Sequence, residues 1–460
     1  MRRMMTRVVR GVGLMGVCLL GGSRAGAFAD PTYHRDVEPL LQKHCQDCHR
    51  PGQVAPFALL TYEQARKRAS DIQSVVDDRK MPPWHASTHS GGPFRGARVM
   101  NDAEIKTLAD WVASDCPEGD PKDAPAPRRW DSAWSLGKPD LVLTPGQGYK
   151  LAASGPDELR VFVIPTNLTE GRFIRAVDFR PGNTRVVHHM LCAFDTTGRA
   201  RELDEAEPGP GYLTFGGYGR LKNGMPFFPS GGLGGWAPGK FPNELKGGVG
   251  RYLPAKADVL LQVHYHRNGK PETDASEVGI YFATEPIDKL VRGALVTPPR
   301  PRVLARPNLR IPAGESNHEV TGSWTARADV HLHAITPHMH WLGKDFLLTA
   351  VFPDGKRQIL IKVDHWDFNW QDIYDFQASV AIPAGTKIEL LAHFDNSAAN
   401  PTNPNKPPKL VTWGEQTTDE MCIGFLHFTR DAEHLHGQPP KQSGWIEMID
   451  SRAPSTKAGL

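Results

Sequence analysis

DVLLQVHYH, residues 258–266, is the stretch that decides the fold class. Apolar residues run unbroken through its first part, and polar and apolar residues alternate through the rest. A run of this length, followed by Asn and Gly, is typical of a β-strand in a buried sheet. Five other runs have the same character: LRVFVIP (159–165), EVGIYFA (277–283), DFLLTAVF (345–352), QILIKV (358–363) and KIELLAHF (387–394).

These runs predict two all-β domains rather than one. Short strands separated by Gly, Pro and Asn indicate antiparallel sandwiches, and the β-rich part is too long for a single small sandwich. The proline-rich stretch PPRPRVLARP marks the break, near residues 286–306. We therefore expect one sandwich over 138–287, a second over 288–450, and a short tail at 451–460.

The chain before residue 119 has a different character. VEPLLQKHC (37–45) and NDAEIKTLADWVASD (101–115) place apolar residues at helical spacing, and the second opens with an Asn/Asp cap. This pattern, together with Cys45-Gln46-Asp47-Cys48-His49, resembles small c-type cytochrome domains and predicts a small all-α cytochrome c domain over 30–118. The proline-rich and charged stretch that follows predicts a linker over 119–137.

The N-terminus has the pattern of a secretory signal. A basic stretch, MRRMMTRVVR, precedes the apolar GVGLMGVCLLGG, and small residues end at Ala29. We expect residues 1–29 to be removed and the protein to be periplasmic or secreted. No later stretch is apolar over the length of a membrane span. The net charge of +3 gives no indication of nucleic-acid binding.

Cys45-Gln46-Asp47-Cys48-His49 is a CxxCH motif. The two thiols of this motif attach haem c covalently, and the histidine becomes an axial iron ligand. Export supports this interpretation, because the attachment takes place outside the cytoplasm. Met81, in the stiff sequence MPPW, is the predicted sixth ligand. Met100 is the alternative, and either methionine could instead belong to the core.

The spacing of the histidines is unusual. Nineteen histidines in 460 residues would form fewer than one His-His and one His-x-His pair by chance, yet the chain has one His-His pair and four His-x-His pairs. Alternate residues of a strand share a face, so two such imidazoles can converge on one metal ion. Adjacent His188 and His189 can do so only at a bulge or a strand end.

Four motifs occur in order: VVHHM (186–190), LLQVHY (260–265), HMHWLGK (338–344) and TDEMC (418–422). In this order they resemble the copper type II, ascorbate-dependent monooxygenases, over roughly residues 138–450. The resemblance implies two copper ions on two jelly-roll-like sandwiches. It assigns His188, His189 and His264 to the electron-transferring copper, and His338, His340 and Met421 to the oxygen-binding copper. A soft thioether favours Cu(I), the form that binds dioxygen.

The substrate machinery of the peptide-amidating members is not retained. The positions of their arginine, asparagine and tyrosine are Thr336, Ile423 and Phe425 here, so the sequence disfavours a peptide carboxylate as substrate. Aromatic side chains suggest an apolar or ring-bearing substrate, with sandwich core as the alternative; they are Trp341, Trp366, Phe368, Trp370 and Trp413. His266, His331 and His333 are expected to be structural or solvent-facing.

The sequence thus predicts an exported monooxygenase that uses dioxygen, an organic substrate and an external electron donor, either an ascorbate-like reductant or a redox protein. Its haem would relay the electrons to copper. The alternative is a non-catalytic haem carrier whose sandwiches serve as docking modules. After export and haem attachment, the remaining cysteines are Cys116, Cys192 and Cys422, and Cys192 with Cys422 is the candidate disulfide.

Overall fold

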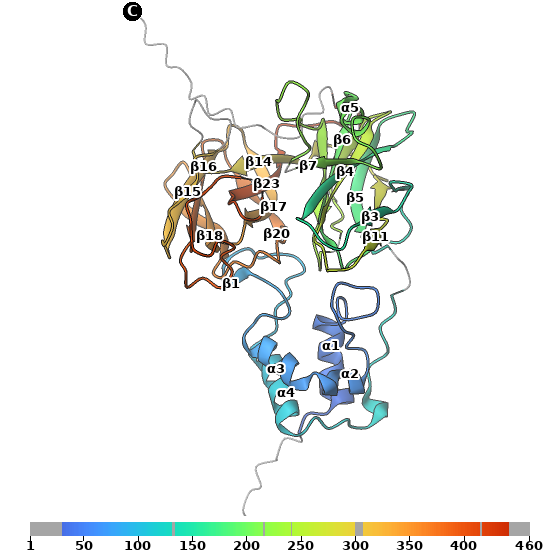
Figure 1. The fold of residues 1–460 in the computed structure, drawn as a ribbon, viewed down its shortest axis with the longest axis vertical. Coiled ribbons are helices and arrows are strands. Elements are labelled where there is room, and N and C mark those ends of the chain that lie inside the picture. The colour runs from blue at the N-terminus through green and yellow to red at the C-terminus, as the bar shows by residue number, and fades with distance from the viewer. Residues whose placement is uncertain are drawn as a thin grey trace, which may run out of the picture.

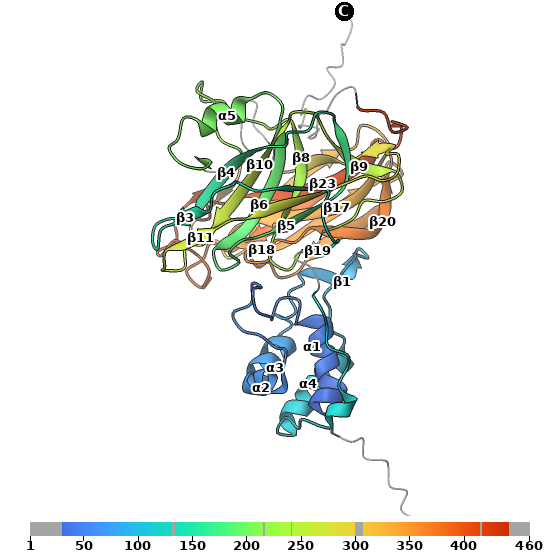
Figure 2. The same ribbon diagram turned by 90° about the vertical axis from the view of Figure 1, so that its right-hand side faces the viewer.

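The computed structural model describes residues 30–130, 134–214, 217–240, 242–299, 307–414 and 416–440. Two β-sandwiches lie side by side, and a helical region lies below both of them (Figures 1 and 2). The predicted signal peptide, residues 1–29, and the predicted tail, 451–460, lie outside the described residues. Among the described helices, none has both the length and the apolar character to cross a membrane.

The first sandwich consists of two five-stranded sheets. One has the order β7-β4-β10-β6-β8 and the other β13-β9-β5-β12-β2. The strands of the first sheet are β7 (Tyr212–Thr214), β4 (Glu158–Pro165), β10 (Asp258–Tyr265), β6 (Val187–Asp195) and β8 (Gly231–Trp236). Those of the second are β13 (Lys289–Leu290), β9 (Val249–Leu253), β5 (Arg172–Arg180), β12 (Glu277–Phe282) and β2 (Leu141–Leu143). A small ribbon of β3 (Tyr149–Leu151) and β11 (Glu272–Asp274), and the helix α5 (Arg199–Asp204), complete it.

The second sandwich pairs a five-stranded with a four-stranded sheet, in the orders β1-β19-β18-β21-β16 and β14-β23-β17-β20. The first has β1 (Ala86–Gly91), β19 (Arg357–Val363), β18 (Gly343–Val351), β21 (Lys387–Phe394) and β16 (His318–Thr325). The second has β14 (Arg292–Val296), β23 (Cys422–Arg430), β17 (Val330–Met339) and β20 (Tyr374–Ile382). The short strands β15 (Arg310–Ile311) and β22 (Val411–Thr412) pair with each other.

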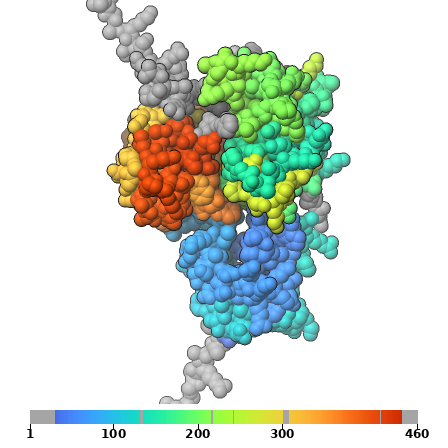
Figure 3. Space-filling model, in the orientation of Figure 1, coloured from blue at the N-terminus to red at the C-terminus, as the bar shows by residue number. Residues whose placement is uncertain are grey.

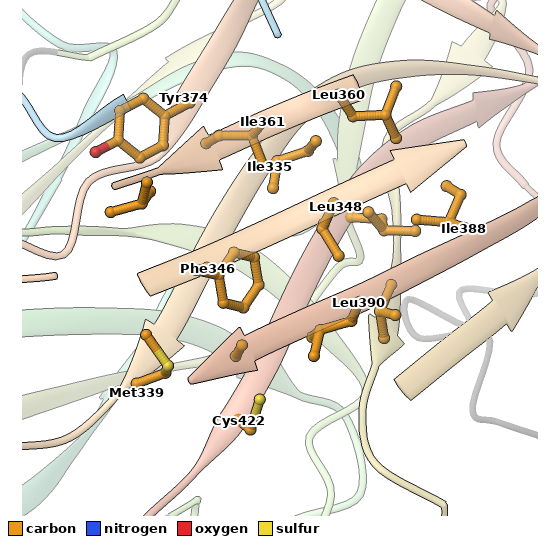
Figure 4. Packing of buried hydrophobic residues seen from close by; sticks show 14 of the residues in the cluster. Ile335, Met339, Phe346, Leu348, Leu360, Ile361, Tyr374, Ile388, Leu390 and Cys422 are labelled. Atoms are coloured by element: carbon orange, nitrogen blue, oxygen red, sulfur yellow. The ribbon is translucent and has the colours of Figure 1, made fainter. Parts of the chain in front are cut away.

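Each sandwich has its own apolar core. In the second, Met339 of β17 and Cys422 of β23 point into the same core as Phe346 and Leu348 of β18 (Figure 4). Because side chains alternate along a strand, the neighbours of Met339 and Cys422 must point out of this core. This alternation places His338 and His340 on the opposite face of the sheet. The mostly β architecture predicted from the apolar runs is confirmed.

The helical region contains η1 (Tyr33–Val37), α1 (Glu38–His44), α2 (Tyr62–Lys67), α3 (Ala69–Asp77), α4 (Asp102–Ala113) and the single turn η2 (Pro121–Asp123). The predicted cap is confirmed, since the Asn101 side chain accepts from the Glu104 N–H and the Glu104 side chain from the Asn101 N–H. These helices pack around a third core that includes Leu41 and Trp111.

The expectation that residues 30–118 are entirely helical is wrong in one segment. Ala86–Gly91 form β1, which pairs with β19 of the second sandwich. The flanking aromatic side chains explain this attachment, because Trp84 and Phe94 pack against the core of the second sandwich and against Tyr374. Burying these rings outside the helical core is favourable. The helical region is thus joined to the second sandwich through its own chain.

Candidate metal centres

Three histidines of the first sandwich converge where β6 begins and β10 ends. His189 of β6 lies opposite His264 of β10, and the next pair along the ladder is Val187 with Tyr265. His188 is therefore the extra residue of a bulge near the beginning of β6. A bulge turns the side chain of the extra residue, so the adjacent His188 and His189 can both point to the same side of the sheet. The predicted bulge or strand end at this pair is confirmed.

The three Nδ1 atoms face one another. The Nδ1 atom of His188 lies 3.1 Å from that of His189 and 3.3 Å from that of His264, and the His189 to His264 distance is 3.4 Å. Nitrogen ligands at about 2.0 Å from a tetrahedral ion are separated by about 3.3 Å, so the spacing fits a metal centre. Burial lowers the pKa of His188 to about 4 and that of His189 well below its usual value, so both offer lone pairs at neutral pH.

Asp157 orients one of these imidazoles. The Nε2 atom of His264 lies 3.0 Å from a carboxylate oxygen of Asp157, which fixes the tautomer that leaves Nδ1 unprotonated. The other oxygen of Asp157 lies 3.0 Å from Nδ1 of His266, an exposed histidine that is not part of the cluster. Asp157 immediately precedes β4, and no sequence motif distinguished it.

Replacing Asp157 with alanine is expected to weaken copper binding at this cluster by roughly 10- to 100-fold, because His264 loses the carboxylate that orients it. The measurement is a competition titration with a chromophoric chelator. Asp345→Ala is the matched control, because Asp345 also accepts from a histidine, His393, at 2.7 Å, but lies in the second sandwich. Equal copper affinities of the two variants would contradict the assignment.

The second cluster lies at the end of β17. The rings of His338 and His340 have centroids 5.2 Å apart, on the face that points away from the core. The β17–β23 ladder pairs Met339 with Cys422, so Met421 lies across from His340 as the ladder continues. Cys422 points into the core, and alternation therefore puts Met421 on the same face as the two histidines. His338 and His340 lie together on this face, and the place of Met421 beside them stays a prediction.

Both imidazoles of this cluster present Nε2. The Nδ1 atom of His338 lies 2.6 Å from the amide oxygen of Gln371, and that of His340 lies 3.1 Å from the carbonyl oxygen of Asp419. Each acceptor holds the Nδ1 proton and leaves the Nε2 lone pair free for a metal. Burial lowers the pKa of His338, and it lowers that of His340 to about 3. A nitrogen–nitrogen–thioether set suits copper.

Glu420 holds this cluster in shape. Its buried carboxylate accepts hydrogen bonds from the backbone N–H groups of His340 (2.8 Å), Leu342 (2.6 Å) and Met421 (3.1 Å). Burial raises its pKa to about 8, against the effect of these three donors. One side chain thus fixes the backbone on both sides of the cluster.

Replacing Glu420 with alanine is expected to lower the free energy of unfolding by about 3 kcal/mol or more, because three buried N–H groups lose their acceptor. The measurement is denaturant unfolding of the metal-free protein. In the control variant Glu389→Ala, only surface ion pairs to Arg357 and Lys387 are lost, and the expected change is below about 1 kcal/mol. A loss that small in Glu420→Ala would refute the role.

Phe368 lies between the two clusters. Its ring stacks on His188 at 5.5 Å and meets His340 edge-on at 6.0 Å between centroids. Phe368 belongs to the loop between β19 and β20, as does Gln371. The two clusters therefore face each other across one buried phenyl ring, at the junction of the sandwiches. Figure 3 shows the two sandwiches in contact along this junction.

A comparison with known families bears on the second cluster. Residues 303–441 match the copper type II ascorbate-dependent monooxygenase, C-terminal domain. The matched part contains His338, His340 and Met421, and it supports the family that the motifs indicated. A copper-dependent monooxygenase is thereby supported.

Other comparisons add little. No curated protein matches the chain. Among solved structures, the infectious bursal disease virus VP2 subviral particle is 10% identical, with 69% of this chain and 76% of that chain covered, at a TM-score of 0.19. The structure of PNGF-II is 10% identical, with 64% and 62% covered, at a TM-score of 0.21. These scores carry no inference about this chain.

The CxxCH residues follow helix α1, and haem attachment at them stays a prediction. Cys45 and Cys48 are both free thiols. The Nδ1 atom of His49 lies 3.2 Å from the carbonyl oxygen of Phe57, which leaves Nε2 for iron. Met100 is 4% exposed and packs in the helical core, whereas Met81 is partly exposed.

The proposed disulfide is absent. Cys192 and Cys422 are free, and they belong to the cores of different sandwiches, so they cannot pair. The predicted aromatic side chains have mixed positions. Trp366 and Trp413 pack against the second core, and the Trp366 indole N–H donates to the His340 carbonyl oxygen at 3.0 Å. Trp341 packs on Phe368 at 4.6 Å between centroids.

Proposed function

We propose that the protein is an exported two-copper monooxygenase that hydroxylates a C–H bond of an organic substrate with electrons relayed through a covalently bound haem c. The observation that carries this proposal is the pair of imidazole clusters that face each other across Phe368. In the first cluster three Nδ1 atoms face one common point, and in the second the Nδ1 atoms of His338 and His340 are engaged, which leaves their Nε2 atoms for a metal. The family match over the second cluster supports the same conclusion.

When bound, copper and haem would supply the redox chemistry, in which one atom of dioxygen enters the substrate and the other leaves as water, with two electrons and two protons consumed. The chain's residues prepare the site for it. His188, His189 and His264 would hold one ion, and His338, His340 and Met421 the other. The Met421 thioether, a soft ligand, favours the reduced ion. Phe368, 8% exposed, keeps water from the space between the clusters.

The helical region is tied to the second cluster by a chain of contacts. Arg98 donates to the carbonyl oxygens of Pro83 (2.9 Å) and Gly239 (3.1 Å) and forms an ion pair with Asp372. Asp372 follows Gln371, the partner of His338. Pro83 follows Met81 by two residues, so the predicted haem ligand and a predicted copper ligand are connected by few intervening groups. We infer that electrons enter the copper centres through this junction.

Replacing Arg98 with methionine is expected to weaken the docking of the helical region by about 2 kcal/mol, because a largely buried charge pair is broken. This corresponds to a roughly 30-fold smaller docking equilibrium constant. Haem reoxidation after oxygen exposure should then slow, while product formation with ascorbate as direct reductant stays. Stopped-flow absorbance of the haem measures this. Arg79→Met is the control, because its ion pair with Asp102 lies on the surface of the helical region. An unchanged reoxidation rate in Arg98→Met would rule out this route.

The function is tested with the reduced, copper-loaded protein. Anaerobic reduction is followed by oxygen exposure with a panel of benzylic, amine, peptide and small organic-acid substrates, and haem reoxidation and product mass are recorded. The proposal predicts a product heavier by one oxygen atom. Haem reoxidation without any oxygenated product from the whole panel would contradict it.

A further inference from the structure

A cavity of about 90 Å³ lies between the two sandwiches. The first sandwich contributes residues of β5, β8, the segment after β8, and β9. The second contributes residues of β17, β20 and β23 and the segment before β20. The polar and aromatic residues of its lining include Trp236, Lys240, Arg251, His333, Asp375 and His427. Neither imidazole cluster lines this cavity.

Arg251 is the unusual member of the lining. Its guanidinium forms no hydrogen bond or ion pair with any residue in the described parts of the chain, although it carries five donors. Burial lowers its pKa to about 10, so it remains a cation at neutral pH. An unpaired guanidinium away from bulk solvent is costly unless an anion or water satisfies it.

Two carboxylates, those of Asp375 and Asp178, share the cavity with the cations Arg251 and Lys240. Lys240, whose side chain is 15% exposed, lies 3.7 Å from a carboxylate oxygen of Asp375. The other oxygen of Asp375 accepts from the Asn243 amide at 2.9 Å, so that carboxylate is already engaged. Asp178 also lines the cavity, and it accepts from the backbone N–H groups of Ser135 (2.9 Å) and Phe179 (2.8 Å). Both carboxylates are thus engaged by other donors, and neither forms an ion pair or hydrogen bond with Arg251 in the described parts of the chain.

The rest of the lining suits a small organic anion. Nδ1 of His333 and of His427 has no partner among the described residues, while their Nε2 atoms approach Thr429 (3.0 Å) and Thr336 (3.4 Å). The remaining surface includes Trp236 and aliphatic side chains. A planar guanidinium binds a carboxylate through two parallel hydrogen bonds, and the volume admits only a short hydrocarbon group.

The cavity is linked to the second cluster along one strand face. His427 approaches Thr336, which lies on β17 two residues before His338. No cation precedes His338 on β17, but Arg251 and Lys240 of the first sandwich supply positive charge to the same face. If the carboxylate of a ligand binds in this cavity, the rest of that ligand would extend along β17.

We propose that Arg251 and Lys240 form a binding site for the carboxylate of a small organic acid, which is the substrate class of this protein. The existence of the site is independent of copper, and only the statement that its ligand is the substrate rests on the proposed function. Two separate measurements therefore test the two parts.

Binding is tested on the full-length protein with acetate, and acetamide as the uncharged control, at constant ionic strength. Acetate should raise the melting temperature saturably and acetamide should not. Arg251→Met should weaken acetate binding by roughly 10- to 100-fold, because charged hydrogen bonds are lost. Without acetate this variant should be at least as stable as the parent, since an unpaired buried charge is removed. Arg172→Met, on neighbouring β5, should bind acetate normally.

Equal effects of acetate and acetamide, or unchanged acetate binding in both Arg251→Met and Lys240→Met, would overturn the site. The second variant covers the case in which the first does not fold. In the parent, acetate should compete with an organic-acid substrate and therefore raise KM without changing kcat. This effect of acetate should be weaker in Arg251→Met. Acetate binding that leaves this KM unchanged would overturn the substrate assignment. Acetate binding by a protein that takes up no copper would leave the site standing and refute the proposed function.

Discussion

Met421→Ile should abolish substrate hydroxylation and leave the haem absorption spectrum unchanged. Isoleucine has a similar volume and no sulfur, so the cluster of His338 and His340 would lose its soft ligand and its preference for the reduced ion. The rate of hydroxylation should fall by more than roughly 100-fold. Loss of a residue that only supports a metal ligand lowers activity by at most about that factor. The measurement is substrate-dependent oxygen consumption, with product mass as a second readout.

Met225→Ile is the matched control for this variant. Met225 is 60% exposed and lies far along the chain from both clusters, so its replacement should leave oxygen consumption at the parent level. Full activity of Met421→Ile would count directly against the second centre. Loss of the haem spectrum together with activity would instead indicate a general folding defect, and unfolding experiments would separate the two.

His264→Ala should reduce bound copper from two ions to one per chain and stop multiple turnover. The three Nδ1 atoms of the first cluster have one common centre, and two imidazoles alone hold an ion much more weakly. Copper is counted by elemental analysis after dialysis, and turnover by product formation.

His266→Ala provides a close control, because His266 is two residues away and binds the same Asp157. Its side chain is 69% exposed, and it should retain both ions. If His264→Ala and His266→Ala retained equal copper, the first centre would not be where the geometry places it.

Much of the fold follows from the apolar runs. LRVFVIP (159–165) corresponds to β4, and DVLLQVHYH (258–266) to β10, because short, mostly apolar runs between turn residues are typical of buried strands. The candidate ligands were found for a related reason. Their spacing is a property of the strand itself, so it can be recognised before the fold is known.

The residues that support the clusters could not be found in this way. Asp157 and Gln371 act on histidines that are 107 and 33 residues away in the chain, and Arg98 pairs with Asp372, 274 residues away. They lie outside strands, where polar side chains are common and no periodicity marks them. Strand β1 was also not predicted, because its small polar residues show neither strand nor helix periodicity. Its position in the sheet is decided by the neighbouring Trp84 and Phe94, which pack against the second core.

The role of Phe368 illustrates the same limit. The sequence marks it as one of five aromatics near the second cluster, with core or substrate contact as equal interpretations. Only the packing of the two sandwiches puts its ring against His188 as well as His340. Contacts between domains depend on their docking, which local sequence patterns do not encode.

The most direct test of the central claim is the metal content of the purified, exported protein. Elemental analysis after copper loading and dialysis should find two copper atoms and one iron atom per chain. Iron with no retained copper would contradict the two-centre account, and the sandwiches would then be docking modules of a haem carrier.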